Sequence, residues 1–290
     1  CMFKFDQLDS VHIEITSRCQ ASCPMCTRNF HGGVENPKLQ LKDWSLDDFK
    51  VIFNNELINQ INSFFFCGNF GDPIINDSLI DMCRYTVQQK PDIEIRIHTN
   101  GGARKEEWWR ELAIVLPKNH NVHIAIDGLE DTHHLYRIGT SYETVIRNAK
   151  AFISEGGKAT WTFLKFKHNE HQISQCRQLS KELGFSGFRL VNHGRNVAPV
   201  FNKNGELTHV LGDYTGEKNF DILFHQKTTN QVLLEDIVSN RTPAKFISCE
   251  TINRKSIYIS ATGDVSPCCY LGFHPKTYGQ GWSHVANEQL

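Results

Sequence analysis

Short apolar runs alternate along the chain with longer segments in which apolar residues recur at helical spacing. Six runs are predicted to be strands, and each of the first five is followed by a predicted helix. Strands that alternate with helices form right-handed βαβ units and a parallel sheet. The predicted strands are 11–15, 63–67, 94–98, 122–127, 160–166 and 187–191, and the predicted helices are 45–58, 76–89, 104–115, 142–155 and 170–183.

The number of these units indicates the fold class. Six units are fewer than the eight of a closed TIM barrel, so we expect an α/β fold with a partial (β/α)6 TIM-like barrel. Helix start signals agree with this pattern: Ser45, Asn76 or Asp77, and Asn169 are expected to cap three of the helices. In such sheets the functional residues gather at the carboxyl ends of the strands.

The alternation of strands and helices stops near residue 193. Further on, 254–272 predicts a strand, a turn at Thr262-Gly263 and a second short strand, which together make a small β-hairpin. We therefore expect three parts, which are a barrel over 1–193, an irregular Gly- and Asn-rich connection over 194–240, and a small appendage over 241–290.

Composition limits the possible functions. The chain has 290 residues, is 40% hydrophobic and has a net charge of −1, without a block of like charges, so we expect no nucleic-acid or anionic-membrane partner. No apolar run approaches the length of a membrane-spanning helix. Ten cysteines without a signal peptide favour a reducing, cytoplasmic location and metal binding over disulfides. The chain begins with Cys1 rather than Met, which is compatible with a fragment of a longer protein.

The segment "TSRCQASCPMCTRNF" places three cysteines directly after the first predicted strand. Cys19, Cys23 and Cys26 can direct three sulfurs at one point, and cysteine thiolates are the ligands of iron–sulfur clusters. Three ligands leave one iron open, as in catalytic metal sites. The alternatives are buried free thiols, or a zinc site that uses Cys23 and Cys26 and needs two further ligands. The motif favours the open cluster.

Glycines follow the next three strands. In "FCGNFGDP", Gly68 and Gly71 allow the backbone to approach a ligand closely, and Asp72 can face an ammonium group. Asn100 and Asp127 each precede a glycine, and for each residue considered alone turn chemistry is the better explanation. Elsewhere, buried thiols packed in the core are expected at Cys83 and Cys176.

The cysteine segment resembles the Cys-x3-Cys-x2-Cys signature of the radical S-adenosylmethionine (radical SAM) enzymes. Met25 stands where an aromatic residue is usual, and Ala125 stands where a serine is expected in the branch with additional clusters. The strand ends "FCGNFGDP", "HTNGG" and "IAIDGLEDTHHLYR" are similar to those that hold the cofactor. The resemblance implies that Cys19, Cys23 and Cys26 bind a [4Fe–4S] cluster and that SAM is bound by Gly68, Asn69, Gly71, Asp72, Asn100, Asp127 and Arg137.

The segment "CETINRKSIYISATGDVSPC" resembles the first half of the auxiliary-cluster module called SPASM or, when shortened, twitch. Cys249, Gly263 and Cys268 match its pattern, which implies a possible second iron–sulfur cluster held by Cys249 and Cys268. The module needs further cysteines downstream, and this sequence has none after Cys269. We therefore expect the chain alone to hold a second cluster poorly.

The resemblance implies a specific activity. A radical SAM enzyme reductively cleaves SAM at its [4Fe–4S] cluster and uses the resulting 5′-deoxyadenosyl radical to abstract hydrogen from a substrate. Here the substrate is an unidentified small molecule or peptide, the electron donor an external protein such as flavodoxin or ferredoxin, and no residue is assigned to catalysis. Two alternatives remain: an iron–sulfur electron-transfer or structural metal-binding protein without SAM cleavage, and a barrel that binds SAM without cleaving it.

Overall fold

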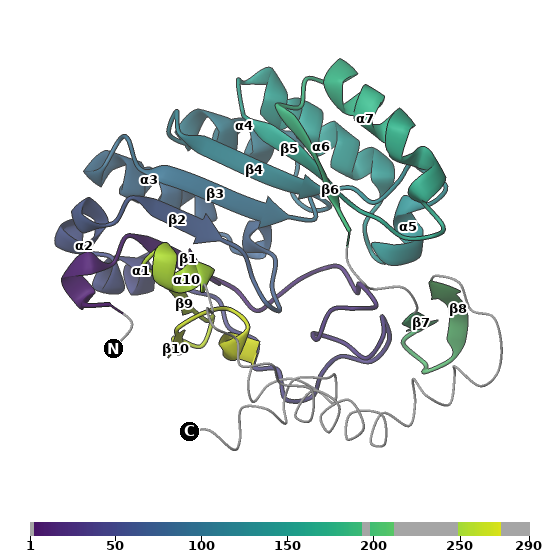
Figure 1. Cartoon of the computed structure of the whole chain (residues 1–290), viewed down its shortest axis with the longest axis horizontal. Helices are drawn as coiled ribbons and strands as arrows, with labels where there is room; N and C mark the ends of the chain where they lie inside the picture. Colours follow the sequence, from purple (N-terminus) through teal and green to yellow (C-terminus); the bar gives the residue numbers. More distant parts are fainter. Residues whose placement is uncertain (1–2, 193–197, 212–248, 274–290) are drawn as a thin grey trace, which may run out of the picture.

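The computed structural model describes residues 3–192, 198–211 and 249–273 of the chain. Its largest element is one sheet of eight strands, β1 (Ser10–Ile13), β2 (Ser63–Phe66), β3 (Glu94–Thr99), β4 (His120–Ala125), β5 (Ala159–Leu164), β6 (Gly187–Val191), β9 (Ser256–Ile259) and β10 (Val265–Ser266). Strands β1 to β6 lie side by side in chain order and every pair is parallel. The expected partial barrel is confirmed (Figure 1).

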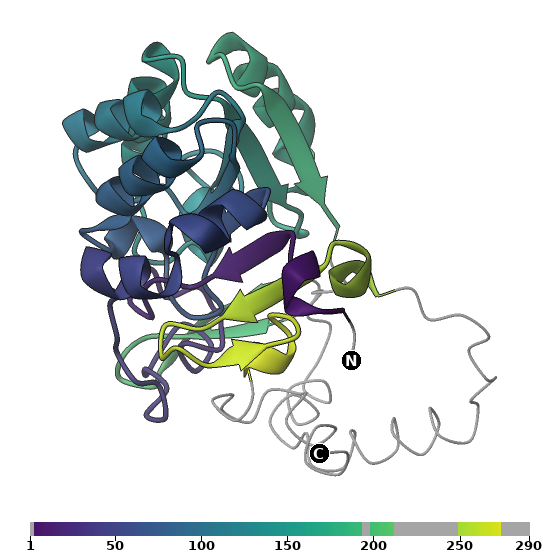
Figure 2. The same ribbon diagram turned by 90° about the vertical axis from the view of Figure 1, so that its left-hand side faces the viewer.

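Helices connect the strands and pack against one face of the sheet. Figure 1 shows α3, α4 and α6 together on one side of strands β2 to β5, and Figure 2 shows the same layer edge-on. The helices are α1 (Leu46–Ile52), α2 (Asn55–Gln60), α3 (Leu79–Gln89), α4 (Glu106–Val115), α5 (His133–Tyr136), α6 (Tyr142–Ser154), α7 (Ile173–Glu182) and α10 (Glu250–Asn253), with 3-10 turns at Phe5–Gln7, Pro73–Ile75, Glu170–Gln172 and Leu271–Phe273. No helix within the described ranges is both long and apolar enough to cross a bilayer.

The expected helix starts agree with the structure at one position and differ at others. Ser45 caps α1 with its side chain, as expected, but the predicted helix 45–58 is two helices, because the Asn54 side chain accepts from Leu57 N and starts α2. Neither Asn76 nor Asp77 caps α3, because the N-cap residue is Ser78; Asn76 Oδ1 accepts from the Ser78 N–H, and its amide donates to the Ile15 and Trp44 carbonyls. Asn169 is the N-cap residue of the 3-10 turn Glu170–Gln172 that precedes α7, but its side chain makes no cap hydrogen bond, because its Oδ1 accepts from the N–H of Phe166.

The core lies between the sheet and the helices and is formed by alternate strand residues. These residues are no more than 1% exposed, and they are Val11 and Ile13, Phe64 and Phe66, Ile95 and Ile97, Val122 and Ile124, and Trp161 and Phe163. Cys83 and Cys176 are fully buried in the same core, as predicted. Because side chains alternate along a strand, the residues between these core positions face the opposite side of the sheet.

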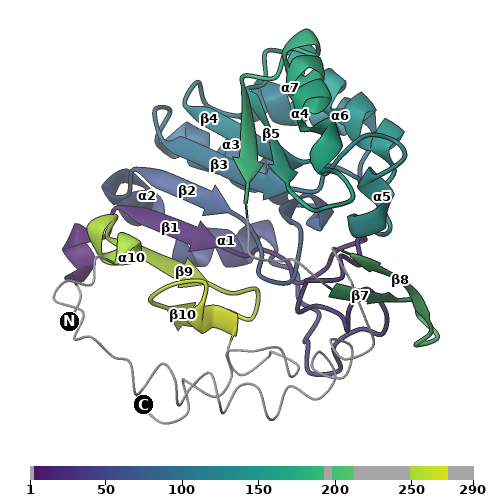
Figure 3. The same ribbon diagram turned by 45° about the vertical axis from the view of Figure 1, so that its right-hand side comes forward.

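The predicted C-terminal hairpin is present and extends the barrel sheet. β9 and β10 pair antiparallel across a turn in which Gly263 has φ +84°, a conformation that glycine adopts without strain. β9 also pairs in parallel with β1, with Ser10 opposite Ser256. Figure 3 shows β9 directly beside β1, with β10 beyond it at the edge of the sheet far from β6. This hairpin therefore continues the sheet past its first strand.

A second hairpin occupies part of the segment that was expected to be irregular. Residues 198–211 form the antiparallel strands β7 (Ala198–Phe201) and β8 (Leu207–Leu211), and the rest of 194–240 lies outside the described residues. Their turn uses Gly205 at φ +80°, so the Asn-Gly pair that suggested a loop is a hairpin signal. The Phe201 N–H donates to the His31 carbonyl at 2.9 Å, so the hairpin packs against the cysteine loop.

Candidate functional site

The three clustered cysteines lie at the carboxyl end of the sheet, in the loop after β1. All three line one cavity of about 560 Å³. Cys23 is buried, whereas Cys19 and Cys26 are partly exposed, and all three are free thiols. The N–H of Cys26 donates to the Cys23 carbonyl at 3.0 Å, so a tight turn brings these two thiols to the same side. One loop thus presents three sulfurs to a common space.

Hydrogen-bond donors approach the sulfur atoms of Cys19 and Cys23. The Ala21 N–H and the Asn100 side-chain amide approach Cys19 Sγ at 3.4 Å and 3.5 Å. Arg137 Nη1 lies 3.7 Å from Cys23 Sγ. Donors of this kind stabilise thiolate more than thiol, and in iron–sulfur proteins they tune the reduction potential. The surroundings of Cys19 and Cys23 therefore suit sulfur atoms that carry negative charge.

Burial opposes that charge as long as the thiols are free. It raises the pKa of Cys19 and of Cys23, although the Arg137 charge partly offsets the effect at Cys23. Burial also raises the pKa of Cys26, to about 11. At neutral pH the free thiols therefore keep their protons, and a bound metal is needed to take them as thiolates.

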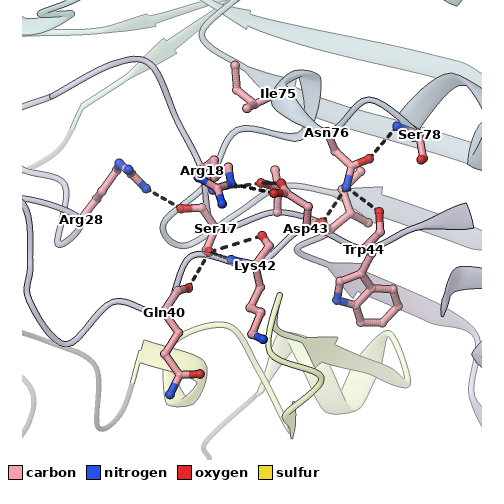
Figure 4. A network of polar contacts seen from close by, with 12 residues as sticks. Ser17, Arg18, Arg28, Gln40, Lys42, Asp43, Trp44, Ile75, Asn76 and Ser78 are labelled. Atoms are coloured by element: carbon pink, nitrogen blue, oxygen red, sulfur yellow. Dashed lines mark hydrogen bonds and ion pairs between the residues drawn. The ribbon is translucent and has the colours of Figure 1, made fainter.

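A polar network holds the start of the cysteine loop in place (Figure 4). The Ser17 hydroxyl donates to the Gln40 carbonyl at 2.7 Å, while the buried Arg28 donates to the Ser17 carbonyl. Arg18 Nε forms an ion pair with Asp43 Oδ2 at 2.6 Å. The segment after the cysteines thus folds back on the residues before them, so both ends of the loop are fixed.

Glu14 organises the glycine segment after β2, and sequence reasoning missed it. Its side chain is 2% exposed, and its Oε1 accepts from the N–H groups of Phe70 and Gly71 at 2.7 and 2.8 Å. Its Oε2 accepts from the Tyr258 hydroxyl at 2.6 Å. A carboxylate within the apolar run "VHIEI" was the available signal, because a buried charge needs partners. Glu14 joins β1, the glycine segment and β9.

The glycines of this segment permit close contact between two loops. A Cβ on Gly71 would collide with the backbone of Thr16, and one on Gly68 would collide with the Gly71 backbone. The Asn69 amide donates to the Cys269 carbonyl at 2.7 Å, which links the segment to the C-terminal hairpin. Gly68, Asn69 and Gly71 all line the cavity.

Asp72 and Asn100 connect the ends of β2 and β3. Asp72 Oδ2 accepts from the Asn100 N–H at 2.7 Å, and its Oδ1 accepts from the Ile74 N–H at 3.2 Å. Burial raises the pKa of Asp72, and these hydrogen bonds act in the opposite direction. Asn100 Oδ1 accepts from the Gly102 N–H at 2.8 Å, so the expected turn chemistry is present. Both side chains also line the cavity.

Asp127 and Arg137 form a buried ion pair beside the cysteines. Arg137 Nε donates to Asp127 Oδ2 at 2.6 Å, and Asp127 Oδ1 accepts from the Leu164 N–H at 2.6 Å. Asp127 is fully buried and does not line the cavity, whereas Arg137 does. Asp127 therefore orients the guanidinium and has no direct access to a ligand.

The structure does not bring every predicted ligand into this cavity. Cys249 and Cys268 flank the β9–β10 hairpin and are absent from the cavity wall, whereas Cys67 is part of it. Within the described ranges, no three His, Cys, Asp or Glu side chains are spaced to hold a single metal ion. Cysteine thiolates are the ligands of a [4Fe–4S] cluster, so three free thiols on one cavity wall fit that group by the type of their donor atoms.

Part of the cavity wall comes from residues that the sequence analysis did not select. They are His98, His123, Thr162, Tyr136 and Tyr270. Of these, His98, His123 and Thr162 occupy the strand positions between core residues. Strict alternation within each predicted strand would have found these three, because they face away from the helices.

The comparison with protein families identifies the class to which this fold and cavity belong. The radical SAM superfamily model matches residues 13–175, which is more than half of the chain. The chain belongs to the radical SAM superfamily. No curated protein sequence is significantly similar to it.

Solved structures agree in fold at low sequence identity. Streptococcus suis SuiB bound to S-adenosylmethionine has a TM-score of 0.57 and 14% identity, and the match covers 91% of this chain and 61% of SuiB. SuiB bound to its precursor peptide SuiA has a TM-score of 0.60 and 15% identity over 92% of this chain and 60% of SuiB. anSMEcpe with bound AdoMet has a TM-score of 0.57 and 18% identity over 91% of this chain and 72% of anSMEcpe. The chain thus spans about 60% of the length of SuiB.

Proposed function

We propose that the chain is the catalytic barrel of a radical SAM enzyme in which Cys19, Cys23 and Cys26 hold a [4Fe–4S] cluster. The observation that carries the proposal is the convergence of three free thiols, two of them beside hydrogen-bond donors, on one cavity at the carboxyl end of the sheet. When bound, such a cluster supplies the electron that cleaves SAM reductively and leaves a 5′-deoxyadenosyl radical for hydrogen abstraction.

The chain's own residues bind and orient the cofactor in this proposal. Arg137, held by Asp127, offers a guanidinium edge to the carboxylate of SAM. Ala125 lines the same cavity and provides no hydroxyl, so the carboxylate depends more strongly on Arg137. The glycine segment brings backbone groups close to the ligand, and Asp72 and Asn100 fix its position between β2 and β3.

We assign Cys249 and Cys268 to a second cluster in a SPASM or twitch module within 241–290, next to a barrel over 1–193. Support comes from the sequence pattern and from the contact of this hairpin with the glycine segment through Asn69 and Cys269. The fold similarity to SuiB and anSMEcpe agrees with this assignment. Iron analysis tests it directly: because the sequence has no cysteine after Cys269, we expect about four irons per chain, whereas about eight would show that the second site is complete.

Substrate, electron donor and location follow from the same proposal. The substrate is a peptide or a small molecule. A peptide is favoured because SuiB has been crystallised with its precursor peptide. A flavodoxin or ferredoxin would supply the electron. The free thiols throughout the described residues suit a reducing, cytoplasmic environment.

Anaerobic reconstitution with iron and sulfide, followed by addition of SAM and dithionite, tests the proposal. The wild-type chain should release 5′-deoxyadenosine, measured by chromatography. Cys23→Ala leaves two cysteine ligands and should lose both the brown colour and at least 100-fold in product, an order-of-magnitude expectation for a group essential to the chemistry. Cys83→Ala removes a fully buried core thiol of α3 and serves as the matched control.

The outcomes separate the proposal from its alternatives. A coloured wild-type chain that yields no 5′-deoxyadenosine would indicate an electron carrier or a metal-binding protein. Full activity in Cys23→Ala would remove that residue from the site. Equal losses in Cys23→Ala and Cys83→Ala would mean that general destabilisation, not loss of a ligand, caused the effect.

A further inference from the structure

The inner face of the barrel carries a row of polar side chains that leads away from the cysteine cavity. His98 on β3 and His123 on β4 line the cavity, and their ring centroids are 4.3 Å apart. His123 Nδ1 is 3.2 Å from Thr162 Oγ1 on β5. Thr162 is in turn the register partner of Arg189 on β6. Four adjacent strands therefore contribute polar groups to a continuous inner wall.

The Arg189 side chain lies on the inner face of β6, as part of this wall. Its neighbour Phe188 stacks with Trp161 and Phe163 in the outer core, with ring centroids 6.2 and 6.0 Å away, so the alternate residue Arg189 faces inward. Arg189 is exposed. Within residues 3–192, 198–211 and 249–273, no carboxylate forms an ion pair with its guanidinium.

Arg96 on β3 adds a second guanidinium to the inner face. Its Cζ lies 5.4 Å from the centroid of the Phe65 ring. Its Nε is buried and has no hydrogen-bond partner in the described part of the chain. Glu94 Oε1 lies 3.5 Å from that Nε, too far for a strong hydrogen bond. This guanidinium therefore retains unused donor capacity.

The two imidazoles add donors without adding charge. Burial, and then the neighbouring His123, lower the pKa of His98 to about 3. Burial lowers the pKa of His123 to about 4, and the charges of Arg189 and Arg96 act in the same direction. The charges of Arg189 and Arg96 also lower the pKa of His98. Glu94 is the carboxylate that pairs with one of the two guanidiniums, and the neutral imidazoles add no charge, so positive charge remains on the wall.

We infer that the substrate carries an oxyanion, a carboxylate or a phosphate, which binds to Arg189 and Arg96 on the inner face while His98 and His123 donate hydrogen bonds beside it. The inference rests on the proposed function, because it takes this wall as the substrate side of the cofactor cavity. Guanidinium groups recognise both oxyanions through paired N–H donors. Anchoring the charged group here places the rest of the substrate toward the cysteine cavity.

A metal ion is the main competing occupant for two adjacent imidazoles. Among the described residues, no group of three His, Cys, Asp or Glu side chains has metal-binding spacing, and the inner face has no such group around His98 and His123. Two guanidiniums would also repel a cation. An anion fits the charge of the wall.

Calorimetric titration of the reconstituted full chain tests the inference, with SAM present so that the Arg137 site is already filled. The probes are inorganic phosphate and succinate. Arg189→Gln should weaken binding of the preferred anion at least tenfold. Arg177→Gln is the matched control and should stay within twofold of wild type, because Arg177 lies 4.8 Å from the Phe188 ring on the outer face of the same strand. Preference for phosphate or for succinate identifies the substrate group.

Failure to bind either anion, or equal weakening by the two arginine variants, would overturn the inference. If circular dichroism shows that Arg189→Gln does not fold, Glu94→Gln provides a second test. It removes the carboxylate nearest Arg96 and should tighten anion binding two- to fivefold, whereas unchanged binding would refute the site. Release of 5′-deoxyadenosine by wild type is measured separately, so anion binding and SAM cleavage can fail independently.

Discussion

The two faces of the barrel sheet are made from alternate residues of the same strands, yet they differ in chemistry. The outer face consists of side chains such as Phe64, Ile97 and Trp161, which are fully buried against the helices. The inner face carries charged and polar side chains, among them Glu14 and Arg96, which make specific polar contacts or retain free donors. Outer residues thus stabilise the fold mainly through apolar burial, whereas inner residues hold polar groups at defined positions.

This difference determines which substitutions each face should tolerate. An apolar residue of similar volume can replace an outer residue at modest cost, since packing is the main requirement there. An inner residue contributes donors, acceptors or charge at a fixed place, and a residue of equal size but different polarity loses them. The comparison can be tested with pairs of neighbouring residues that face opposite sides.

Phe64 and Phe65 on β2 form the sharpest such pair. Phe64→Ala leaves a cavity in a fully buried core and should lower the free energy of unfolding by about 3–5 kcal/mol. Phe65 is partly exposed and contacts His12 and His98, so Phe65→Ala should cost less than about 2 kcal/mol. Urea denaturation at equal m-values measures both. Similar losses in the two variants would contradict the division between the faces.

The next largest loss in the free energy of unfolding is expected for Glu14, a residue of the inner face. Glu14→Gln keeps the volume but replaces one acceptor oxygen by an amide, so the contact with either Tyr258 or the glycine segment is lost. We expect a loss of about 2 kcal/mol, the usual scale for a hydrogen bond to a charged group. Tyr258→Phe removes a single donor and should cost about 1 kcal/mol.

A double-mutant cycle between Glu14 and Tyr258 sharpens this test. The two losses should be non-additive by about 0.5 kcal/mol or more, because the residues share a 2.6 Å hydrogen bond. Additive losses in denaturation would show that Glu14 acts independently of β9.

Sequence alone predicted the six strands of the barrel because each strand is a short continuous segment with its own apolar pattern. It could not predict that β9 would pair with β1, since the pairing of Ser10 with Ser256 joins distant segments that carry no local signal of it. The division of the helix at 45–58 was missed for a different reason. Asn54 was read as part of a helical pattern although its short side chain favours a cap.

The candidate site was predictable to the extent that it depends on a motif. The spacing of Cys19, Cys23 and Cys26 indicated one loop, and the structure shows the three side chains lining one cavity. The residues that position the site were harder to predict from the sequence. Asp127 was expected to bind SAM or to form a turn, but it is absent from the cavity wall and orients Arg137 through a tertiary ion pair. Such contacts depend on the packing of separate loops, so no short segment encodes them.

The last predicted effect concerns the pH dependence of the inner face. His12, His98 and His123 have pKa values lowered to between about 3 and 4, mainly by burial. In the unfolded chain their pKa values return to about 6.5, so below that pH the unfolded state binds more protons than the folded state. The free energy of unfolding should therefore fall as the pH drops from about 6.5 toward 4 and should depend little on these groups above pH 7.

His98→Asn removes one of these three titrating imidazoles. At pH 8 the variant differs from wild type only through packing and hydrogen bonding, because the histidine is neutral in both folded and unfolded states. At pH 5.5 wild type should have lost roughly 1 kcal/mol more than the variant relative to pH 8. Urea denaturation at the two pH values gives the difference directly. Parallel losses in wild type and variant would mean that His98 takes up a proton in the folded protein as readily as in water, which would contradict a buried, electropositive inner wall.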